Sequence, residues 1–255
     1  MRRVHLLPCG YEECDKGSLT LMKDYGQIVD LPYYVYLIED DESAILVDTG
    51  CSDNWKELHP EIILKLYPPH IKDEERFERV LGSVGFKPDD VDFVINTHLH
   101  YDHCGNNRLF SRARILVNET ELQHALAPGW WESLPYVRAT FDIPQLKYQT
   151  VRGAFDVTPG VRIIPTPGHT AGHQSVVVKL EKTGTLVLAG DAISHRENLE
   201  LPILPGLYVD AEMYAHSKDQ LRQLAESGTL VLTHSREYLT RNAWLPMKDG
   251  VQVFE

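Results

Sequence analysis

The feature that constrains this chain most is a dense histidine cluster. Its members, His98, His100, Asp102 and His103, lie within six residues, directly after the apolar segment Val91–Ile95. That segment has the composition of a β-strand, so the cluster is expected on a loop at a strand end. Imidazole and carboxylate groups suit zinc and similar divalent ions, and one short loop could supply ligands to two neighbouring ions. An isolated loop histidine is often simply solvated, but packing several so tightly brings no structural benefit, so the cluster predicts a metal site.

Length, charge and composition narrow the class of protein. With 255 residues and 43% hydrophobic content, the chain can bury a substantial core, and we expect one compact domain over residues 1–255. The formal net charge is -12 and no block of lysine and arginine occurs, so a nucleic-acid partner is not expected. No apolar run approaches the length of a membrane span. These observations favour a globular protein that binds neither nucleic acid nor a membrane.

The N-terminal segment and the cysteines bear on the compartment. Met1–Pro8 carries two arginines but too short an apolar stretch for a signal peptide. The cysteines, Cys9, Cys14, Cys51 and Cys104, form no CxxC pair, which suits a reducing compartment. Cys104 adjoins the histidine cluster, but a small residue buried under the loop is the better interpretation. A cytoplasmic location is therefore expected.

Apolar periodicity divides the chain into alternating strands and helices. Further strands are expected at Val4–Leu7, Leu31–Glu39, Ala44–Asp48, Arg114–Val117, Val161–Thr166, Ser175–Leu180, Thr185–Ala189 and Thr229–Thr233. Helices are expected at Asn54–Leu66, Asp73–Val84, Glu119–Leu126 and Ala211–Glu226. Periodicity fails over Ala127–Gln149, where Trp130 and Trp131 could be core anchors or a lid over a pocket. This alternation predicts an α/β fold with helices packed outside sheets.

Four of the predicted strands end in potential metal ligands. The histidine cluster follows one of them, and His169, Asp191 and His234 each follow a later strand. Side chains at one edge of a sheet can converge on one site although they are far apart in sequence. Alone, none of the three later residues would mark a site. Their shared position after an apolar strand adds them to the predicted ligands.

These ligands resemble the metal motif of the metallo-β-lactamase superfamily, with H-x-H-x-D-H at His98–His103 and the three later residues in the matching order. The resemblance implies an αβ/βα four-layer sandwich of two similar halves, with a dinuclear metal site at one edge. Together with His98–His103, three further segments resemble the N-acyl homoserine lactonase branch: Leu31–Gly50, the segment around Gly85–Asp90, and Thr166–Ser175. The resemblance extends from about residue 30 to residue 235, which is most of the chain.

The resemblance implies a role for each ligand. One divalent ion would be held by His98, His100 and His169, the other by Asp102, His103 and His234, with Asp191 bridging them. The implied cofactors are two divalent ions, expected to be Zn²⁺, although cobalt, manganese and iron accept the same ligands. Asp48 matches an aspartate that the family places behind the site, and His173 matches a supporting position. From spacing alone, Asp48 would be an ordinary turn residue before Gly50.

The resemblance also implies a reaction. Hydroxide formed at two divalent ions could attack a lactone carbonyl, and Asp102 is suited to pass a proton to the leaving alkoxide. The implied function is hydrolysis of the lactone ring of N-acyl homoserine lactones, so the expected partner is a small acyl lactone. One residue departs from the branch, which usually carries a tyrosine where this chain has Ser194. His195 or Tyr208 could instead donate to the substrate carbonyl, and the sequence leaves both open.

Two alternatives accompany this prediction. A hydrolase of the same superfamily could cleave another lactone, an ester, a thioester or a phosphoester, and a non-catalytic metal-binding or signal-binding protein could keep the fold. The segments around Trp130–Trp131 and Leu201–Tyr208 are expected to build the substrate pocket, so their composition distinguishes the candidate substrates. An acyl chain needs an apolar groove there, whereas a glutathione or phosphate group needs cationic side chains. Their aromatic and leucine-proline content favours an acyl chain. The sequence indicates neither the oligomeric state nor the preferred chain length.

Overall fold

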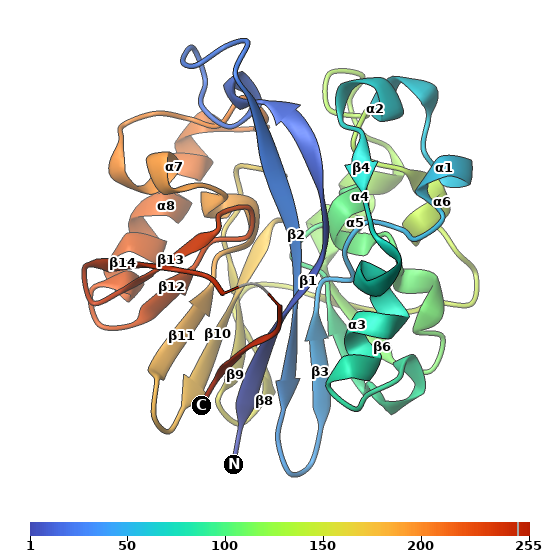
Figure 1. The fold of residues 1–255 in the computed structure, drawn as a ribbon, viewed down its shortest axis with the longest axis vertical. Helices are drawn as coiled ribbons and strands as arrows, with labels where there is room; N and C mark the ends of the chain where they lie inside the picture. The colour runs from blue at the N-terminus through green and yellow to red at the C-terminus, as the bar shows by residue number, and fades with distance from the viewer. Residues whose placement is uncertain (249) are drawn as a thin grey trace.

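Two β-sheets packed face to face form the centre of the protein (Figure 1). The computed structural model describes residues 1–248 and 250–255. Across the first sheet, the described strands lie in the order β15 (Gln252–Phe254), β1 (Arg3–Asp15), β2 (Ile28–Glu39), β3 (Ala44–Val47), β5 (Phe93–Ile95), β6 (Arg114–Asn118) and β7 (Lys147–Val151), with β4 (Pro69–His70) paired to β1. Across the second sheet the order is β14 (Ala243–Pro246), β13 (Glu237–Thr240), β12 (Thr229–Val231), β11 (Gly184–Leu188), β10 (Gln174–Leu180), β9 (Val161–Pro165) and β8 (Phe155–Thr158).

Helices cover the outer face of each sheet. Those beside the first sheet are α1 (Trp55–Leu58), α2 (Glu61–Leu66), α3 (Phe77–Ser83), α4 (Tyr101–Cys104), α5 (Glu119–Leu126) and α6 (Arg138–Phe141) (Figure 1). Those beside the second sheet are α7 (Arg196–Glu200) and α8 (Ala211–Ala225). The layers confirm the predicted αβ/βα sandwich. No helix among the described residues combines the length and apolar character that a membrane span requires.

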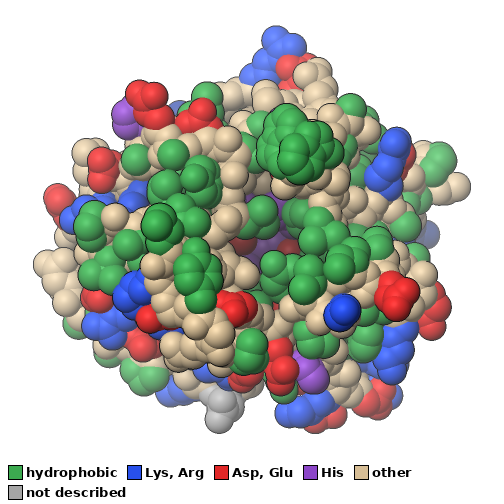
Figure 2. All heavy atoms as spheres, turned by 90° about the horizontal axis from the view of Figure 1, so that it is seen from above, with side chains coloured by type: hydrophobic (Ala, Val, Ile, Leu, Met, Phe, Trp, Pro, Cys, Tyr) green, Lys and Arg blue, Asp and Glu red, His purple; other side chains and the backbone are tan. Residues whose placement is uncertain are grey.

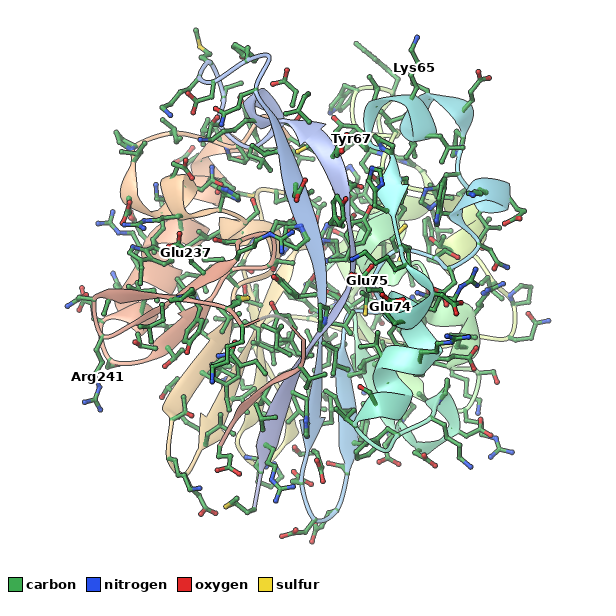
Figure 3. The ribbon with its side chains drawn as sticks, in the orientation of Figure 1. Lys65, Tyr67, Glu74, Glu75, Glu237 and Arg241 are labelled. Atoms are coloured by element: carbon green, nitrogen blue, oxygen red, sulfur yellow. The ribbon has the colours of Figure 1, made fainter. Side chains whose placement is uncertain are left out.

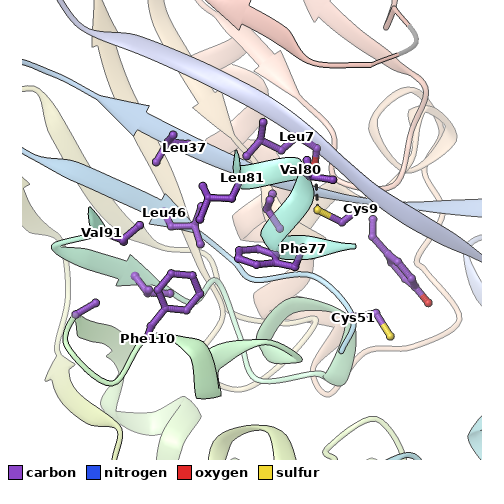
Figure 4. Packing of buried hydrophobic residues seen from close by; sticks show 14 of the residues in the cluster. Leu7, Cys9, Leu37, Leu46, Cys51, Phe77, Val80, Leu81, Val91 and Phe110 are labelled. Carbon is purple, nitrogen blue, oxygen red and sulfur yellow. Dashed lines mark hydrogen bonds between the residues drawn. The ribbon is translucent and has the colours of Figure 1, made fainter. Parts of the chain in front are cut away.

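The central strands of the first sheet are buried on both faces. In β3, Leu46 points toward the helices and Val47 toward the second sheet, because side chains alternate along a strand. On the helical side, Phe77 of α3 packs edge to face against Phe110 with ring centroids 5.6 Å apart (Figure 4). Between the sheets, Val47 belongs to the same apolar cluster as Val176 of β10. Strands buried on both sides explain the continuous apolar runs in the sequence.

Strand direction brings the loops that follow several strands to one edge. In the first sheet β3, β5 and β6 are parallel neighbours. In the second sheet β11 and β12 are parallel, and β9 shares their direction because β10 is antiparallel to both β9 and β11. The carboxyl ends of strands with a common direction lie at the same edge of a sheet. The predicted ligands all follow strands of this kind, namely β5, β9, β11 and β12.

The differences from the predicted elements have local causes. The expected helix Asn54–Leu66 is two helices, α1 and α2, because Pro60 lies between them and cannot continue a helix. The expected helix Asp73–Val84 begins as a 3₁₀ turn before α3 starts. β1 extends well beyond the expected segment, through a bulge at Gly10, where φ is +97°. Short edge strands such as β14 were not predicted, since most of their side chains are exposed and show no apolar alternation.

Candidate metal centre

The histidine loop starts at the end of β5 and runs into α4. His98 and His100 are both buried, with ring centroids 4.4 Å apart. The backbone of His100 is extended, and the single turn of α4 then carries Asp102 and His103. Gly105 follows this turn where a Cβ atom would lie 2.2 Å from a backbone nitrogen, so only glycine fits. The loop position of the cluster is as the sequence predicts.

The structure brings all seven predicted ligands together. The first set, here called the three-histidine group, comprises His98, His100 and His169; the second, the mixed group, comprises Asp102, His103 and His234. In each group the ligand atoms lie within 4.8 Å of one another. Asp191 lies between them, with Oδ2 3.4 Å from Nε2 of His169 and Oδ1 3.2 Å from Nε2 of His234. Each carboxylate oxygen of Asp191 therefore faces a different group, as a bridging ligand requires.

Several buried atoms at this place have no hydrogen-bond partner among the described residues. They are Nε2 of His98, His103 and His234, and Oδ1 of Asp191. Buried polar atoms are nearly always paired, so their convergence indicates a bound group. Imidazole nitrogens and carboxylate oxygens suit divalent transition metals. The side chains present therefore fit two divalent ions bridged by Asp191.

Hydrogen bonds on the outer side orient three of the ligand histidines. Nδ1 of His103 lies 2.8 Å from Oδ2 of Asp48. Nδ1 of His234 lies 2.9 Å from the carbonyl oxygen of Pro32, and Nδ1 of His169 lies 3.1 Å from that of Leu207. An acceptor at this position keeps the proton on Nδ1 and leaves Nε2 free to bind a metal.

Asp48 combines a turn conformation with a contact to the site. Its φ is +60°, in the left-handed region, as a turn residue before Gly50 can adopt. Its carboxylate also accepts hydrogen bonds from the backbone nitrogen and the hydroxyl of Thr97, at 2.7 and 2.8 Å. Together with the contact to His103, these bonds show that Asp48 is more than a turn residue.

Two further buried residues support the loops that carry the ligands. His173 accepts a hydrogen bond at Nε2 from the backbone nitrogen of Asp191, at 2.9 Å. Glu121 of α5 accepts from the backbone nitrogen of Leu99 at 3.0 Å and from the hydroxyl of Thr170 at 2.6 Å. Glu121 thus ties the histidine loop to the loop of His169. The sequence alone did not single out Glu121, because a lone glutamate in a helix is ordinarily solvated.

The two groups differ in their electrostatics. Burial lowers the pKa values of all members of the three-histidine group, so these imidazoles are neutral. Burial opposes protonation of His234 as well, but Asp191 and then Asp102 outweigh it and raise the pKa to about 9. The pKa of His103 is raised well above its usual value because Asp102, Asp191 and Asp48 together outweigh burial. In turn, His103 and His234 lower the pKa of Asp102 to about 2 against the effect of burial.

Comparison with known proteins identifies the family. The model of the metallo-beta-lactamase superfamily matches residues 28–234. The chain belongs to this superfamily. An N-acyl homoserine lactonase from Bacillus sp is 32% identical over 228 residues, 88% of each chain, and the N-acyl homoserine lactonase AttM from Agrobacterium fabrum is 29% identical over 99% of this chain and 98% of its own. The structure of an N-acyl homoserine lactone hydrolase with N-hexanoyl-L-homoserine at its catalytic metal centre is 31% identical, with a TM-score of 0.82, and covers 91% of this chain and 92% of its own.

Above this metallo-β-lactamase centre lies a cavity of about 180 Å³. Figure 2 shows histidine and acidic side chains at the bottom of a hollow surrounded by hydrophobic side chains. The apolar lining comprises Leu19, Leu31, Trp131, Leu134, Pro135, Pro205 and Leu207. Tyr67, which follows α2, also lines the cavity and lies beside the upper part of β1 (Figure 3). No lysine or arginine in the described ranges lines it.

The cavity lining distinguishes among the candidate residues whose roles the sequence did not decide. Trp130 and Trp131 are 86% and 64% exposed, so neither is a core anchor, and Trp131 lines the cavity. Ser194 lines it too, whereas neither Tyr208 nor His195 does. The reason is local: Ser194 follows the 3₁₀ turn Gly190–Ile193, whereas His195 is the extended residue that caps the start of α7 and lies near Glu197.

Cys104 is buried under the histidine loop, as expected from the sequence. Its Sγ lies 3.4 Å from the carbonyl oxygen of Leu99 and 3.2 Å from the hydroxyl of Thr140. The other three cysteines are also buried and free. Cys104 therefore packs against the loop from below and does not join the ligand set.

Proposed function

We propose that this protein is a metal-dependent hydrolase that opens the lactone ring of N-acyl homoserine lactones. The observation that carries the proposal is the apolar cavity above Asp191, whose described lining contains no lysine or arginine. Such a cavity suits an uncharged acyl chain whose polar head reaches the metal centre. The lactonase names of its relatives and the product bound to a related structure point to the same substrate class.

Seven side chains would hold the two ions. We assign the three-histidine group to one ion, the mixed group to the other and Asp191 to both. Divalent ions bound there supply Lewis acidity toward a carbonyl oxygen and lower the pKa of water toward neutrality. Neutral imidazoles and two carboxylates suit zinc, which we propose as the natural metal.

The side chains around the ions handle the protons and the carbonyl. Asp102 lines the cavity and is kept ionised by the neighbouring histidines, so a carboxylate oxygen is available to take a proton from water and pass it to the leaving alkoxide. We keep His195 and Tyr208 as candidate donors to the carbonyl, but Ser194 is better placed because it lines the cavity. The Ser194 hydroxyl makes no hydrogen bond to a described residue, whereas its carbonyl accepts from the backbone nitrogen of His234.

The same cavity argues against the alternative substrates. A glutathione thioester or a phosphoester presents fixed negative charges, which need lysine, arginine or further metal ligands in the wall. The described part of the wall contains no lysine or arginine, and Glu12, which is not among the proposed metal ligands, adds a further carboxylate to it. Another uncharged lactone or ester remains the second candidate, since the cavity would accept its chain equally well.

The proposal also covers the partner of the protein and its cellular compartment. The partner is a small molecule, and the net charge of -12 supports the absence of a nucleic-acid partner. Four free, buried cysteines are compatible with a reducing cytoplasm.

The test is proton release by the zinc-loaded protein on N-acyl homoserine lactones of short and long chain, beside a glutathione thioester. We expect rapid opening of the lactones, loss of activity on chelation with recovery on adding zinc, and little action on the thioester. A protein with full metal content that opens no acyl homoserine lactone would overturn the proposal. Faster cleavage of the thioester would move the substrate to that class.

A further inference from the structure

A buried glutamate lies in the cavity wall without a lysine or arginine partner among the described residues. Glu12 is 3% exposed and lines the cavity together with Asp102. The hydroxyls of Tyr33 and Tyr101 donate to its Oε2 at 2.6 and 2.8 Å. No lysine or arginine in the described part of the chain forms an ion pair with it. A buried carboxylate is rare and costly unless it is paired, so its presence here indicates a role in the site.

The strand holds Glu12 firmly in this position. β1 shifts its register against β2 between Pro8 and Tyr11. Beyond this bulge, Glu12 and Cys14 are buried, while Tyr11 and Glu13 are partly exposed. The inward direction of Glu12 therefore follows from the bulge and the alternation of the strand, and not from a mobile loop.

The two tyrosines leave one carboxylate oxygen for a ligand. Each carboxylate oxygen has about two lone pairs for hydrogen bonds, and both tyrosine hydroxyls use Oε2. Oε1 accepts no hydrogen bond from a described residue. Tyr33 and Tyr101 thus hold the carboxylate while Oε1 can accept a hydrogen bond from a molecule in the cavity.

The charge of a loaded metal centre favours the ionised form of Glu12. Burial raises the pKa of this carboxyl to about 8, and the charge of Asp102 acts in the same direction. Two divalent ions bring four positive charges, while Asp102 and Asp191 bring two negative charges and neutral imidazoles bring none. The excess positive charge lowers the pKa of a neighbouring carboxyl. In its ionised form Glu12 can only accept hydrogen bonds.

We propose that Glu12 sets substrate specificity by accepting a hydrogen bond from the amide N–H of the substrate. This inference rests on the proposed function. In an N-acyl homoserine lactone the amide nitrogen is attached to the ring carbon next to the scissile carbonyl. Because Glu12 and Asp102 line the same small cavity, a carbonyl placed over the metal centre brings the adjacent N–H toward the Glu12 wall. A simple alkyl lactone has no such donor and gains nothing from Glu12.

The decisive variant is Glu12→Gln. Its carbonyl oxygen can still accept from both tyrosines, so the shape and packing are kept, but an NH₂ group replaces the acceptor that faces the cavity. The substrates are N-hexanoyl homoserine lactone and α-heptyl-γ-butyrolactone, which has a chain of similar length without the amide. We expect kcat/KM for the amide lactone to fall about ten- to a hundredfold, mainly through KM, and that for the alkyl lactone to change less than about threefold.

Binding and metal content give readouts that do not depend on turnover. Calorimetry with the ring-opened product N-hexanoyl homoserine should show weaker binding to Glu12→Gln by a similar factor, with metal content unchanged. Tyr33→Phe should give a smaller loss of kcat/KM on the amide lactone, because the carboxylate still accepts a hydrogen bond from the hydroxyl of Tyr101. Glu39→Gln, at the opposite end of the same strand pair, is the control and should change neither substrate.

The outcomes are distinct. Equal losses on both lactones, or a loss of metal, would mean that Glu12 supports the centre and not specificity, and unchanged kinetics would mean that no such hydrogen bond forms. Retained preference for the amide lactone in Glu12→Gln with loss in Glu12→Leu would show that any polar side chain suffices at this position, so the carboxylate would not set specificity and the proposal would fail. If the unmodified protein opens neither lactone, the proposed function itself fails and takes this inference with it.

Discussion

The two halves of the metal centre have ligands in opposite protonation states. In the three-histidine group, burial lowers the pKa of every imidazole, and each is neutral and ready to bind a metal. In the mixed group, neighbouring carboxylates raise the pKa values of His103 and His234, so both imidazoles carry a proton near neutral pH. An ion entering the first half displaces no proton, whereas an ion entering the second must displace about two. The two sites therefore differ in how their metal affinity depends on pH.

The difference follows from where the carboxylates lie. Nε2 of His103 is 3.4 Å from Asp102 and 3.5 Å from Asp191, and its Nδ1 contacts Asp48. The three-histidine group contains no carboxylate of its own; it contacts Asp191, whose Oδ2 lies 3.4 Å from Nε2 of His169. Proximity to negative charge favours the imidazolium form and burial opposes it, so the balance differs between groups only a few ångströms apart.

The largest expected effect comes from Asp191→Asn, which acts on both halves at once. The amide has a similar shape but only one oxygen and no charge, so it cannot bridge the two groups. We expect loss of metal and a fall in kcat/KM of roughly a thousandfold or more on the best lactone. Metal content measured by elemental analysis, beside the activity assay, checks the result. Full activity with two ions per chain would contradict the assignment of Asp191.

A second test uses pH to separate the halves. Loading the first ion should release almost no protons, and loading the second about two, when calorimetry is performed near pH 7 in buffers of different ionisation enthalpy. Affinity for the second ion should accordingly rise by up to about a hundredfold per pH unit below pH 9, and affinity for the first should change little. Equal proton release in the two steps would remove the distinction between the groups.

The raised pKa of His234 also predicts how the stability of the metal-free protein depends on pH. His234 has a pKa of about 9 in the folded state against about 6.5 in the unfolded chain, so its protonated form stabilises the fold below pH 6.5. This contribution is lost as pH rises through 9, and the free energy of unfolding should fall by roughly 1–3 kcal/mol. Chemical denaturation of metal-free protein at pH 6.5 and pH 9 measures it, and loading with metal should abolish the trend.

A more selective change is Asp48→Asn, which removes a direct contact to the mixed group and none to the three-histidine group. Asp48 fixes the orientation of His103 through Nδ1 and is itself held by Thr97. Loss of such an outer hydrogen bond typically costs about ten- to a hundredfold in metal affinity. We expect that loss for the second ion, with the first ion bound normally, so elemental analysis at limiting metal should give one ion per chain. A uniform loss of both ions would show that Asp48 supports the whole loop.

The sequence was sufficient for the fold and for the ligand cluster because both leave local patterns. The histidine spacing and the position of His169, Asp191 and His234 after apolar strands can be recognised along the chain, and the parallel strands bring them to one edge. Glu12 and Glu121 leave no such pattern, since a single glutamate in a strand or helix is ordinarily solvated. Only the bulge in β1 and the packing of α5 show that these two are buried.

The sequence also could not predict the direction in which individual side chains point. His195 adjoins Ser194 in the chain, yet only Ser194 lines the cavity, because the 3₁₀ turn after β11 decides which residue faces inward. The exposure of Trp131 could not be predicted either, since a loop without periodicity carries no signal for burial. Motifs thus specify which residues bind, while turn geometry specifies what surrounds the substrate.

The smallest effect on metal binding is expected from Glu121→Gln, the counterpart of Asp48→Asn in the first half. Glu121 forms no hydrogen bond to a described ligand side chain; it accepts from the backbone of Leu99 and Gly172 and from the hydroxyls of Thr170 and Tyr136. Glutamine can keep some of these bonds but presents an NH₂ group to at least one donor. The resulting unpaired contact should lower the free energy of unfolding by about 1–3 kcal/mol.

Affinity for the first ion should fall by less than tenfold, because the imidazoles keep the hydrogen bonds that orient them, such as the one between His169 and the carbonyl oxygen of Leu207. If metal affinity instead fell as far as in Asp48→Asn, the position of the backbone would matter as much as a direct hydrogen bond to a ligand, and the two halves would be supported in the same way.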